Sequence, residues 1–195
     1  MDNLKESPTL EELEEELGRE EYKFRFKKVL RNTVYSLITV AAVAVLMATL
    51  LFPVLQIYGT SMTPTLSEGQ IVLTLKKGTL SDYQQGDIVA FYYNNKVLVK
   101  RVIATGGDYV YISDSGVVSV NGQVLDEPYV DALSLGECDM TFPYQVPEGK
   151  YFLMGDHRSV SIDSRTSAIG AVSEEDIVSK IFLRVWPLTD ISLIE

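Results

Sequence analysis

The sequence predicts a mainly β protein, with an antiparallel, barrel-like domain that follows one N-terminal transmembrane helix. Three observations support this fold class. Residues 34–54 form an uncharged and strongly apolar run. The segments after it are short, rich in β-branched and aromatic residues, and separated by turn-forming residues. No long amphipathic helix pattern follows residue 58, so strands are expected to supply the core of the domain.

The apolar run is long enough to cross a bilayer. As a helix at about 1.5 Å per residue, residues 34–54 would extend roughly 31 Å, which matches the hydrocarbon core. A cleaved signal peptide is disfavoured because the run is too long, begins far into the chain and ends without a clear A-x-A site. We therefore predict a single membrane anchor over residues 31–57.

Charge predicts the orientation of this anchor. Basic residues cluster on its N-terminal side at Lys23, Arg25, Lys27, Lys28 and Arg31. Such clusters favour the cytoplasmic side of a membrane. The tail, residues 1–30, is therefore expected in the cytoplasm, and the domain formed by residues 58–195 outside it. The predicted location is the cell membrane, crossed once.

The first part of the tail is acidic. Leu10, Leu13 and Leu17 form a thin apolar stripe among many glutamates. A helix could start at Ser7-Pro8, or at Thr9 with Glu12 as a capping box. Such a segment is typically a solvated acidic helix or a disordered tail. The alternative is a docking site for a cytoplasmic partner, because blocks of charge often serve as interaction tails.

Composition excludes several classes of function. The formal net charge of -10 at pH 7 argues against nucleic-acid binding, because a phosphate-binding surface needs a basic excess. Cys138 is the one cysteine, which excludes an internal disulfide and a cysteine-rich zinc site. His157 is the one histidine, so only a carboxylate-dominated metal site stays open.

Strands are expected along the rest of the chain. The expected strands are Gln70–Leu75, Asp87–Tyr93, Lys96–Ile103, Val117–Val120, Gln123–Leu125, Tyr151–Met154 and Ile177–Val185. Asn94-Asn95 and Asn121-Gly122 are typical two-residue hairpin turns. A helical turn is expected at 173–176. Residues 113–145, with scattered Gly, Pro and Asp, suggest an inserted subdomain or a long excursion.

Ser61 is the candidate nucleophile. It lies between Gly59, which allows a sharp turn, and Pro64, which restricts the backbone, so its hydroxyl is presented at a defined place. Plain turns have the same composition, so this segment alone is weak evidence. Ser61 follows the apolar run closely and can lie at most about 25 Å from the hydrocarbon edge.

A nucleophilic serine needs a base, and two candidates exist. Lys100 and Arg101 point to opposite faces of a predicted strand whose faces are otherwise apolar, so one of these charges must lie against hydrophobic surface. A buried ammonium can lose its proton, whereas a guanidinium cannot. This favours Lys100, unless that lysine merely snorkels from an edge strand. His157 allows a rival triad with Ser61 and an aspartate.

A polar loop follows the strand at 151–154. Residues 155–165 contain two acids, two arginines and three serines, and such a density of polar groups beside a core strand requires mutual pairing. The loop is either a salt-bridged turn or a scaffold that orients a base.

Four segments in this order resemble type I signal peptidases, the membrane-bound serine proteases with a Ser/Lys dyad. They are Gly59–Leu66, Gly86–Phe91, Val99–Ile103 with Gly107-Asp108, and Gly155–Arg165. The resemblance implies cleavage of N-terminal signal peptides from exported precursor proteins at the outer membrane face, by acyl-enzyme hydrolysis. It implies no metal or organic cofactor, and the precursors and the lipid bilayer as partners.

The resemblance also implies roles for individual residues. Ser61 would be the nucleophile, its backbone N–H would stabilise the oxyanion, and Lys100 would be the general base. Ser161 would hydrogen-bond the Lys100 amine, Asp163 and Arg165 would form a supporting ion pair, and Asp156 would hold the same loop. The substrate groove would involve Met62, Pro64, Ile88 and Phe91.

The sequence departs from the family pattern at several positions. Gly59 stands where some members carry a serine hydroxyl that adds to the oxyanion hole, and His157 and Val160 each replace an asparagine. The last two changes leave the ordering of Ser161 less defined.

Two other classes of function are open. Self-cleaving repressor proteases have a Ser/Lys site and a similar β-core, but their N-terminal part binds DNA. The acidic, membrane-anchored N-terminal part predicted for this chain argues against that class. The second alternative is a catalytically inactive or dedicated membrane-anchored homologue that assists surface-protein or pilus assembly.

Overall fold

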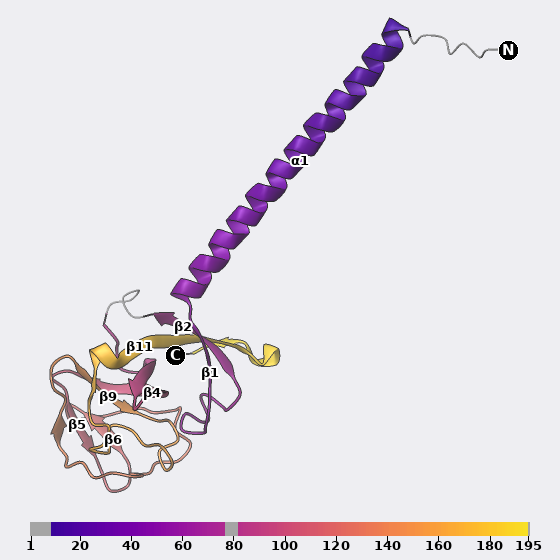
Figure 1. The fold of residues 1–195 in the computed structure, drawn as a ribbon. Coiled ribbons are helices and arrows are strands. Elements are labelled where there is room, and N and C mark those ends of the chain that lie inside the picture. The colour runs from indigo at the N-terminus through magenta and orange to yellow at the C-terminus, as the bar shows by residue number, and fades with distance from the viewer. Residues whose placement is uncertain (1–8, 77–81, 195) are drawn as a thin grey trace. The chain divides into compact units, whose positions relative to one another are not determined.

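The structure, a computed structural model, describes residues 9–76 and 82–194. The chain divides near residue 50 into two compact units. The first is the N-terminal helix, and the second contains all the strands (Figure 1).

The N-terminal helix α1 (Leu10–Leu51) includes much of the acidic tail as well as the apolar run. The Leu13 N–H donates to the carbonyl of Thr9, so the helix begins directly after Thr9, one of the two predicted starts. The other, Ser7-Pro8, lies outside the described residues. From Leu13 to Leu50 it is long and apolar enough to cross a membrane.

The helix ends before the predicted end of the apolar run at Val54. Pro53 explains this difference, because it disfavours helical backbone at the residue before it. The Pro53 carbonyl accepts a hydrogen bond from the Thr74 N–H, so the chain has already joined the sheet at this point. Val54–Gln56 is a strand, although this segment lies inside the predicted anchor 31–57.

The main sheet is antiparallel in all its pairs and confirms the predicted fold class (Figure 1). Its order is β1-β2-β11-β3-β4-β9-β10, and β12 also pairs with β11. Its strands are β1 (Val54–Gln56), β2 (Ile71–Lys76), β3 (Ile88–Tyr93), β4 (Lys96–Thr105), β9 (Lys150–Met154), β10 (Val172–Ser173), β11 (Ile177–Trp186) and β12 (Ser192–Leu193).

A second, smaller sheet is inserted between β4 and β9. It has the order β7-β6-β5-β8. Its strands are β5 (Tyr109–Ile112), β6 (Val118–Val120), β7 (Gln123–Val124) and β8 (Tyr144–Gln145). Three of these four lie within residues 113–145, and β5 precedes that range. Two short 3-10 helices, η1 (Glu174–Asp176) and η2 (Leu188–Asp190), flank β11.

Turn chemistry agrees with the sequence at both predicted hairpins. Asn94 and Asn95 have φ of 47° and 60°, and Asn121 and Gly122 have φ of 52° and 80°. Positive φ at both central residues is the signature of the type I′ turn, which suits the twist of paired strands. The strands that the sequence did not predict are short, with three residues in β1, four in β5 and two each in β8, β10 and β12.

Three buried clusters make up the core of the second unit. One packs Phe152 of β9 and Ile103 of β4 against the smaller sheet, and so joins the two sheets. A second lies around Phe91 of β3. A third contains Met62 and Leu66 and therefore fixes the segment around Ser61 to the main sheet.

The register of β4 brings the candidate site together. Lys100 pairs with Val89 of β3, and Arg101 pairs with Ile88 of β3 and Met154 of β9. Because β9 ends at Met154, the loop that follows begins beside Lys100 and Arg101.

Candidate active site

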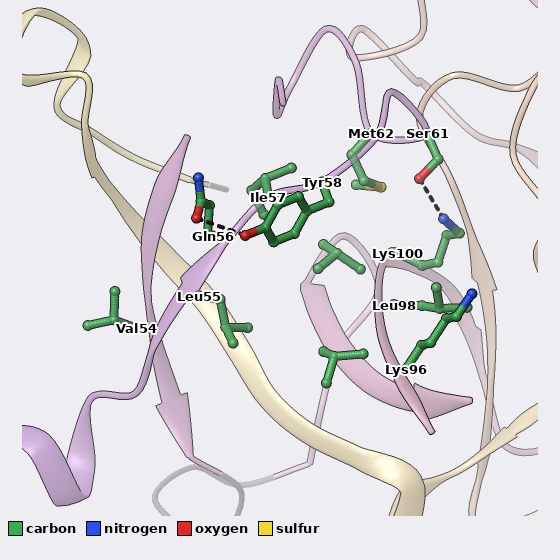
Figure 2. A pocket seen from close by; sticks show the side chains of 12 residues that line it. Val54, Leu55, Gln56, Ile57, Tyr58, Ser61, Met62, Lys96, Leu98 and Lys100 are labelled. Carbon is green, nitrogen blue, oxygen red and sulfur yellow. Dashed lines mark hydrogen bonds between the residues drawn. The ribbon is translucent and has the colours of Figure 1, made fainter. Parts of the chain in front are cut away.

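Ser61 and Lys100 form a hydrogen-bonded pair. The Lys100 Nζ lies 2.7 Å from the Ser61 Oγ, as the dashed line in Figure 2 shows. Lys100 is 3% exposed, whereas Ser61 is only half-buried. The hydroxyl is therefore open to a substrate on one side while the amine behind it is shielded from water.

Burial lowers the pKa of the Lys100 ammonium to about 8. Loss of hydration is the main cause, because the charged form gains most from water. The Arg165 guanidinium lowers this pKa further, while the Asp163 and Asp156 carboxylates oppose the shift. An appreciable fraction of Lys100 is therefore neutral near pH 7, and a neutral amine can accept the proton of Ser61.

The loop after β9 packs directly on the nucleophile. A side-chain Cβ added at Gly155 would lie 2.5 Å from the Ser61 carbonyl oxygen and 2.2 Å from the Ser161 Oγ. The His157 backbone N–H also donates to the Ser61 carbonyl, at 3.1 Å. Only glycine allows this close approach, so Gly155 sets the spacing between the loop and the serine.

Ser161 is 1% exposed and lies against Gly155. Its Oγ has no hydrogen-bond partner among the residues that the structure describes. The predicted bond from Ser161 to the Lys100 amine is therefore not formed in this arrangement, in which the amine is bonded to Ser61. Its predicted role in aiming the amine stays a prediction.

Asp163 and Arg165 form a fully buried ion pair. Their closest nitrogen and oxygen atoms are 2.8 Å apart. Asp163 also accepts from the Gly155 N–H at 2.9 Å, and the Arg165 guanidinium donates to the carbonyls of Leu135, Arg158 and Ser161. The pair thus ties both ends of the loop together, and hydrogen bonds satisfy the buried charges.

Lys100 and Arg101 are both buried, although the sequence required this of only one. Arg101 is 2% exposed and makes a two-pronged pair with Asp156, at 3.0 and 2.9 Å. It also donates to the Gly86 carbonyl. Asp156 accepts from the Thr65 hydroxyl, so this pair links β4, the loop and the nucleophile segment.

The His157 side chain contacts the nucleophile segment but does not bond to the Ser61 hydroxyl. Its Nδ1 lies 2.9 Å from the Thr63 Oγ1 and 3.3 Å from the Thr60 carbonyl oxygen. The Ser61 hydroxyl is bonded to Lys100 instead. This geometry favours Lys100 over His157 as the base. His157 instead stabilises the turn that carries Ser61. Gly59, with φ of 80°, begins the same turn.

A groove of about 660 Å³ opens beside the pair (Figure 2). It is lined by residues 54–58 from β1 and the residues after it, by Ser61 and Met62, and by residues 96–100 of β4. Apart from Lys96, Lys100 and a few hydroxyl and amide groups, these side chains are apolar. Such a lining suits a substrate segment with uncharged, apolar side chains.

The predicted substrate-contacting residues are only partly on this groove. Met62 lines it. Pro64 is exposed and does not, and the preceding peptide bond is cis. Ile88 and Phe91 are each 1% exposed and lie in two different core clusters, because β3 is a central strand covered on both faces. The sequence missed residues 54–58 and 96–99 as groove-lining positions, and residues 54–57 were assigned to the anchor instead.

Sequence reasoning also missed two residues beside the loop, Glu127 and Tyr129. Arg158 is 0% exposed and pairs with Glu127, while the ring of Tyr129 lies 3.9 Å from the Arg101 guanidinium carbon. Glu127 and Tyr129 are far from the loop in sequence, and no local pattern marks them. As to metals, the described ranges 9–76 and 82–194 contain no group of three His, Cys, Asp or Glu side chains that could hold an ion.

Comparison with known proteins identifies relatives of the whole chain. A family model described as signal peptidase, peptidase S26, matches residues 30–186. A signal peptidase IB of Staphylococcus aureus is 39% identical over 155 residues, which cover 69% of this chain and 78% of that protein. A signal peptidase I of Bacillus licheniformis is 31% identical over 175 residues, which cover 85% and 93%.

The chain is also similar to a solved structure. A crystal structure of a signal peptidase I from Enterococcus faecalis V583 has 30% sequence identity and a TM-score of 0.41, with 51% of this chain and 96% of that chain covered.

Proposed function

The chain belongs to the signal peptidase family S26, a family of serine endopeptidases, and on this basis we propose that Ser61 and Lys100 cleave signal peptides from exported precursor proteins. One observation carries the assignment of the two residues. A buried lysine with a lowered pKa lies 2.7 Å from a serine hydroxyl at the edge of an apolar groove.

The reaction is an acyl transfer in two halves. The neutral Lys100 amine takes the proton of Ser61 as the Oγ attacks the scissile carbonyl carbon, and the new ammonium then protonates the departing amine of the mature protein. In the second half, Lys100 takes a proton from the water that attacks the ester carbonyl. The resulting ammonium then returns a proton to the Ser61 Oγ as the ester bond breaks and the signal peptide leaves with a new C-terminal carboxyl group. The developing oxyanion would be stabilised by backbone N–H donors such as that of Ser61.

The strand edges beside the groove support binding of the precursor in an extended form. Within the described part of the chain, β4 pairs with β9 only from Arg101 onward, so residues 96–100 leave one backbone edge open on the β9 side. β1 ends the sheet and pairs with β2 alone. An extended peptide can add to such edges through backbone hydrogen bonds and place alternate side chains in the groove.

The direction of the strands supports a direction for the precursor. Four successive antiparallel pairings, β1–β2, β2–β11, β11–β3 and β3–β4, make β1 and β4 parallel to each other. A precursor whose apolar segment is held in the bilayer would enter at the start of β1, which follows the end of α1 at Leu51. Its residues before the cleavage site would then run along β1 and β4 towards Ser61.

We propose a single membrane crossing with a cytoplasmic N-terminus and an extracytoplasmic β domain. Support comes from the length and apolarity of α1 and from the basic residues on the N-terminal side of its apolar part. Because Ser61 follows Leu51 closely, it can lie at most about 35 Å from the end of the helix, even if the chain between them were fully extended. Cleavage would therefore take place near the membrane surface.

Cleavage of a precursor by the purified full-length chain in detergent tests this function. We expect wild-type protein to release a product whose N-terminus marks a single site, and His157→Ala to do the same. Ser61→Ala and Lys100→Ala should lose cleavage while retaining the circular dichroism spectrum of the wild type. Cleavage by Lys100→Ala, or its loss in a folded His157→Ala variant, would refute the dyad.

A further inference from the structure

A short segment of the inserted region, Glu127-Pro128-Tyr129, contacts two of the three buried arginines that border the candidate site. Glu127 accepts two hydrogen bonds from the Arg158 guanidinium, one of 3.0 Å and one shorter. Tyr129 stacks on the Arg101 guanidinium. The proposed mechanism gives neither residue a role, yet the Glu127 side chain is buried and both residues contact buried guanidinium groups.

Glu127 is connected to the nucleophile through two residues, Arg158 and Gly155. Arg158 is 0% exposed, and its Nε donates to the Gly155 carbonyl at 3.0 Å. Gly155 packs on the Ser61 carbonyl and on Ser161. The position of the Arg158 guanidinium therefore determines how closely the loop lies against Ser61. Glu127, whose side chain is 5% exposed, is the carboxylate that neutralises this arginine.

Tyr129 is connected through Arg101 and Asp156 to Thr65 in the nucleophile segment. Its ring lies 3.9 Å from the Arg101 guanidinium carbon, and Arg101 holds Asp156, which in turn accepts from Thr65. The Tyr129 hydroxyl donates to Glu127 at 2.9 Å. Burial and the neighbouring Glu127 carboxylate raise the pKa of this hydroxyl, so it stays protonated and remains a donor.

From these contacts we infer that Glu127 and Tyr129 are positioning residues, which hold Arg158 and Arg101 in place. Through these arginines they fix the loop at 155–165, which shields Lys100 from water and keeps it aligned with Ser61. The inference rests on the proposed function, and it assigns the inserted region a part in catalysis. Neither residue lines the groove, so both act through the arginines rather than on the substrate.

The charges around Lys100 explain what loss of this support would do. Asp163, Arg165 and Asp156 all act on the Lys100 amine, and all three lie in the loop that Arg158 and Arg101 hold. If Glu127 becomes neutral, the buried Arg158 loses its counter-charge and must recruit water or move. Water that enters beside the loop would hydrate Lys100 and raise its pKa from about 8 towards the ordinary value for lysine.

Glu127→Gln in the full-length chain is the first test, with Asp126→Asn as the matched control. Asp126 is the exposed neighbour, so its change removes the same charge from the surface. For Glu127→Gln, measured with a precursor bearing its signal peptide, we expect kcat to fall on the order of a hundredfold, as for a misaligned reacting group. KM should change little, and the acid limb of the kcat profile should move to higher pH. Glu127→Asp should restore part of the activity, and Asp126→Asn should match the wild type.

A pair of substitutions at Tyr129 separates its two contacts. Tyr129→Phe keeps the ring over Arg101 and removes the hydroxyl bonded to Glu127, so we expect a loss of only a few-fold in kcat. Tyr129→Leu removes the ring, and we expect a larger loss with the same alkaline movement of the acid limb.

A second readout does not depend on cleavage. The rate at which acetic anhydride modifies Lys100, followed by mass spectrometry as a function of pH, reports the pKa of this amine directly. We expect that pKa to be higher in Glu127→Gln than in the wild type and in Asp126→Asn.

The outcomes separate the two proposals. If Glu127→Gln lowers activity only in proportion to the folded fraction, with an unchanged acid limb and unchanged Lys100 labelling, these residues are merely structural and the inference is wrong. If the wild type does not cleave precursors but the Lys100 pKa still rises in Glu127→Gln, the proposed function fails while the positioning of Lys100 stands.

Discussion

At the scale of single residues, the site depends on a lysine that is deprived of water. Lys100 is buried on an otherwise apolar strand and contacts the Ser61 hydroxyl. The effect of burial on its pKa outweighs that of the two carboxylates, Asp163 and Asp156, which favour the charged form. An arginine could not replace it, since a guanidinium stays protonated even when buried. Arg101, the next residue, is also buried, and the Asp156 carboxylate supplies its counter-charge.

The lowered pKa of Lys100 predicts the pH dependence of cleavage. The base must be neutral, so kcat/KM should fall about tenfold per pH unit below a pKa near 8 and level off above it. A pH series with a fixed precursor measures this limb. His157→Ala should leave it in place, whereas an acid limb that disappears in His157→Ala would assign the base to the histidine instead.

Close packing at Gly155 predicts a severe effect of one methyl group. In Gly155→Ala the new Cβ would meet the Ser61 carbonyl and the Ser161 Oγ, so the loop must move away from the nucleophile. We expect a stability cost of about 1–3 kcal/mol and a loss of activity on the order of a hundredfold. Chemical denaturation and a cleavage assay would measure both effects. Gly18→Ala, where a Cβ meets no atom within 4 Å, should lose neither.

At the scale of elements, strand β4 has a different function in each half. Residues 96–100 pair with β3 on one side and leave the other backbone edge open along the groove, whereas residues from Arg101 onward are paired on both sides. Lys100 is the last residue before the second partner begins. The base is therefore held by a central strand, while the open half of that strand stays available to a peptide.

The hairpin that starts β4 gives a test at this scale. Asn95 has φ of 60°, which a β-branched residue tolerates poorly. Asn95→Val should lower the free energy of unfolding by about 1–2 kcal/mol, as expected for a left-handed backbone. Asn95→Gly should not be destabilising, because glycine accepts this backbone. Urea denaturation distinguishes the two, and equal stability of both variants would argue against the type I′ turn.

At the scale of the whole molecule, the chain consists of an exposed apolar helix and a compact β unit with its own core. The core clusters and the pairs that surround Ser61 and Lys100 all lie in the second unit. The helix therefore has no part in the chemistry that we describe, and its proposed role is to hold the site close to the bilayer.

The single cysteine offers a test of this topology. Cys138 lies in the β unit and is half-buried. A membrane-impermeant maleimide should label it in intact cells after mild denaturation of the surface domain. A variant with the cysteine moved to the tail, Cys138→Ser with Glu16→Cys, should react only after the membrane is permeabilised. Labelling of the tail variant in intact cells would reverse the proposed orientation.

The sequence by itself determined the features that depend on local patterns. Apolarity and length defined the helix, alternation and turn residues located the longer strands, and the buried strand position of Lys100 marked the candidate base next to a restrained Ser61. Two-residue strands such as β8 and β10 were not predicted, because such short segments form strands only where the fold places a neighbouring strand beside them.

Tertiary structure alone decided the features that depend on register and on contacts between distant segments. The groove exists because β1 and the open half of β4 face it, and Ile88 and Phe91 are in the core because their strand is central. Glu127 and Tyr129 reach Arg158 and Arg101 across the fold. Such pairings are set by how the two sheets pack, and no residue spacing along the chain encodes them locally.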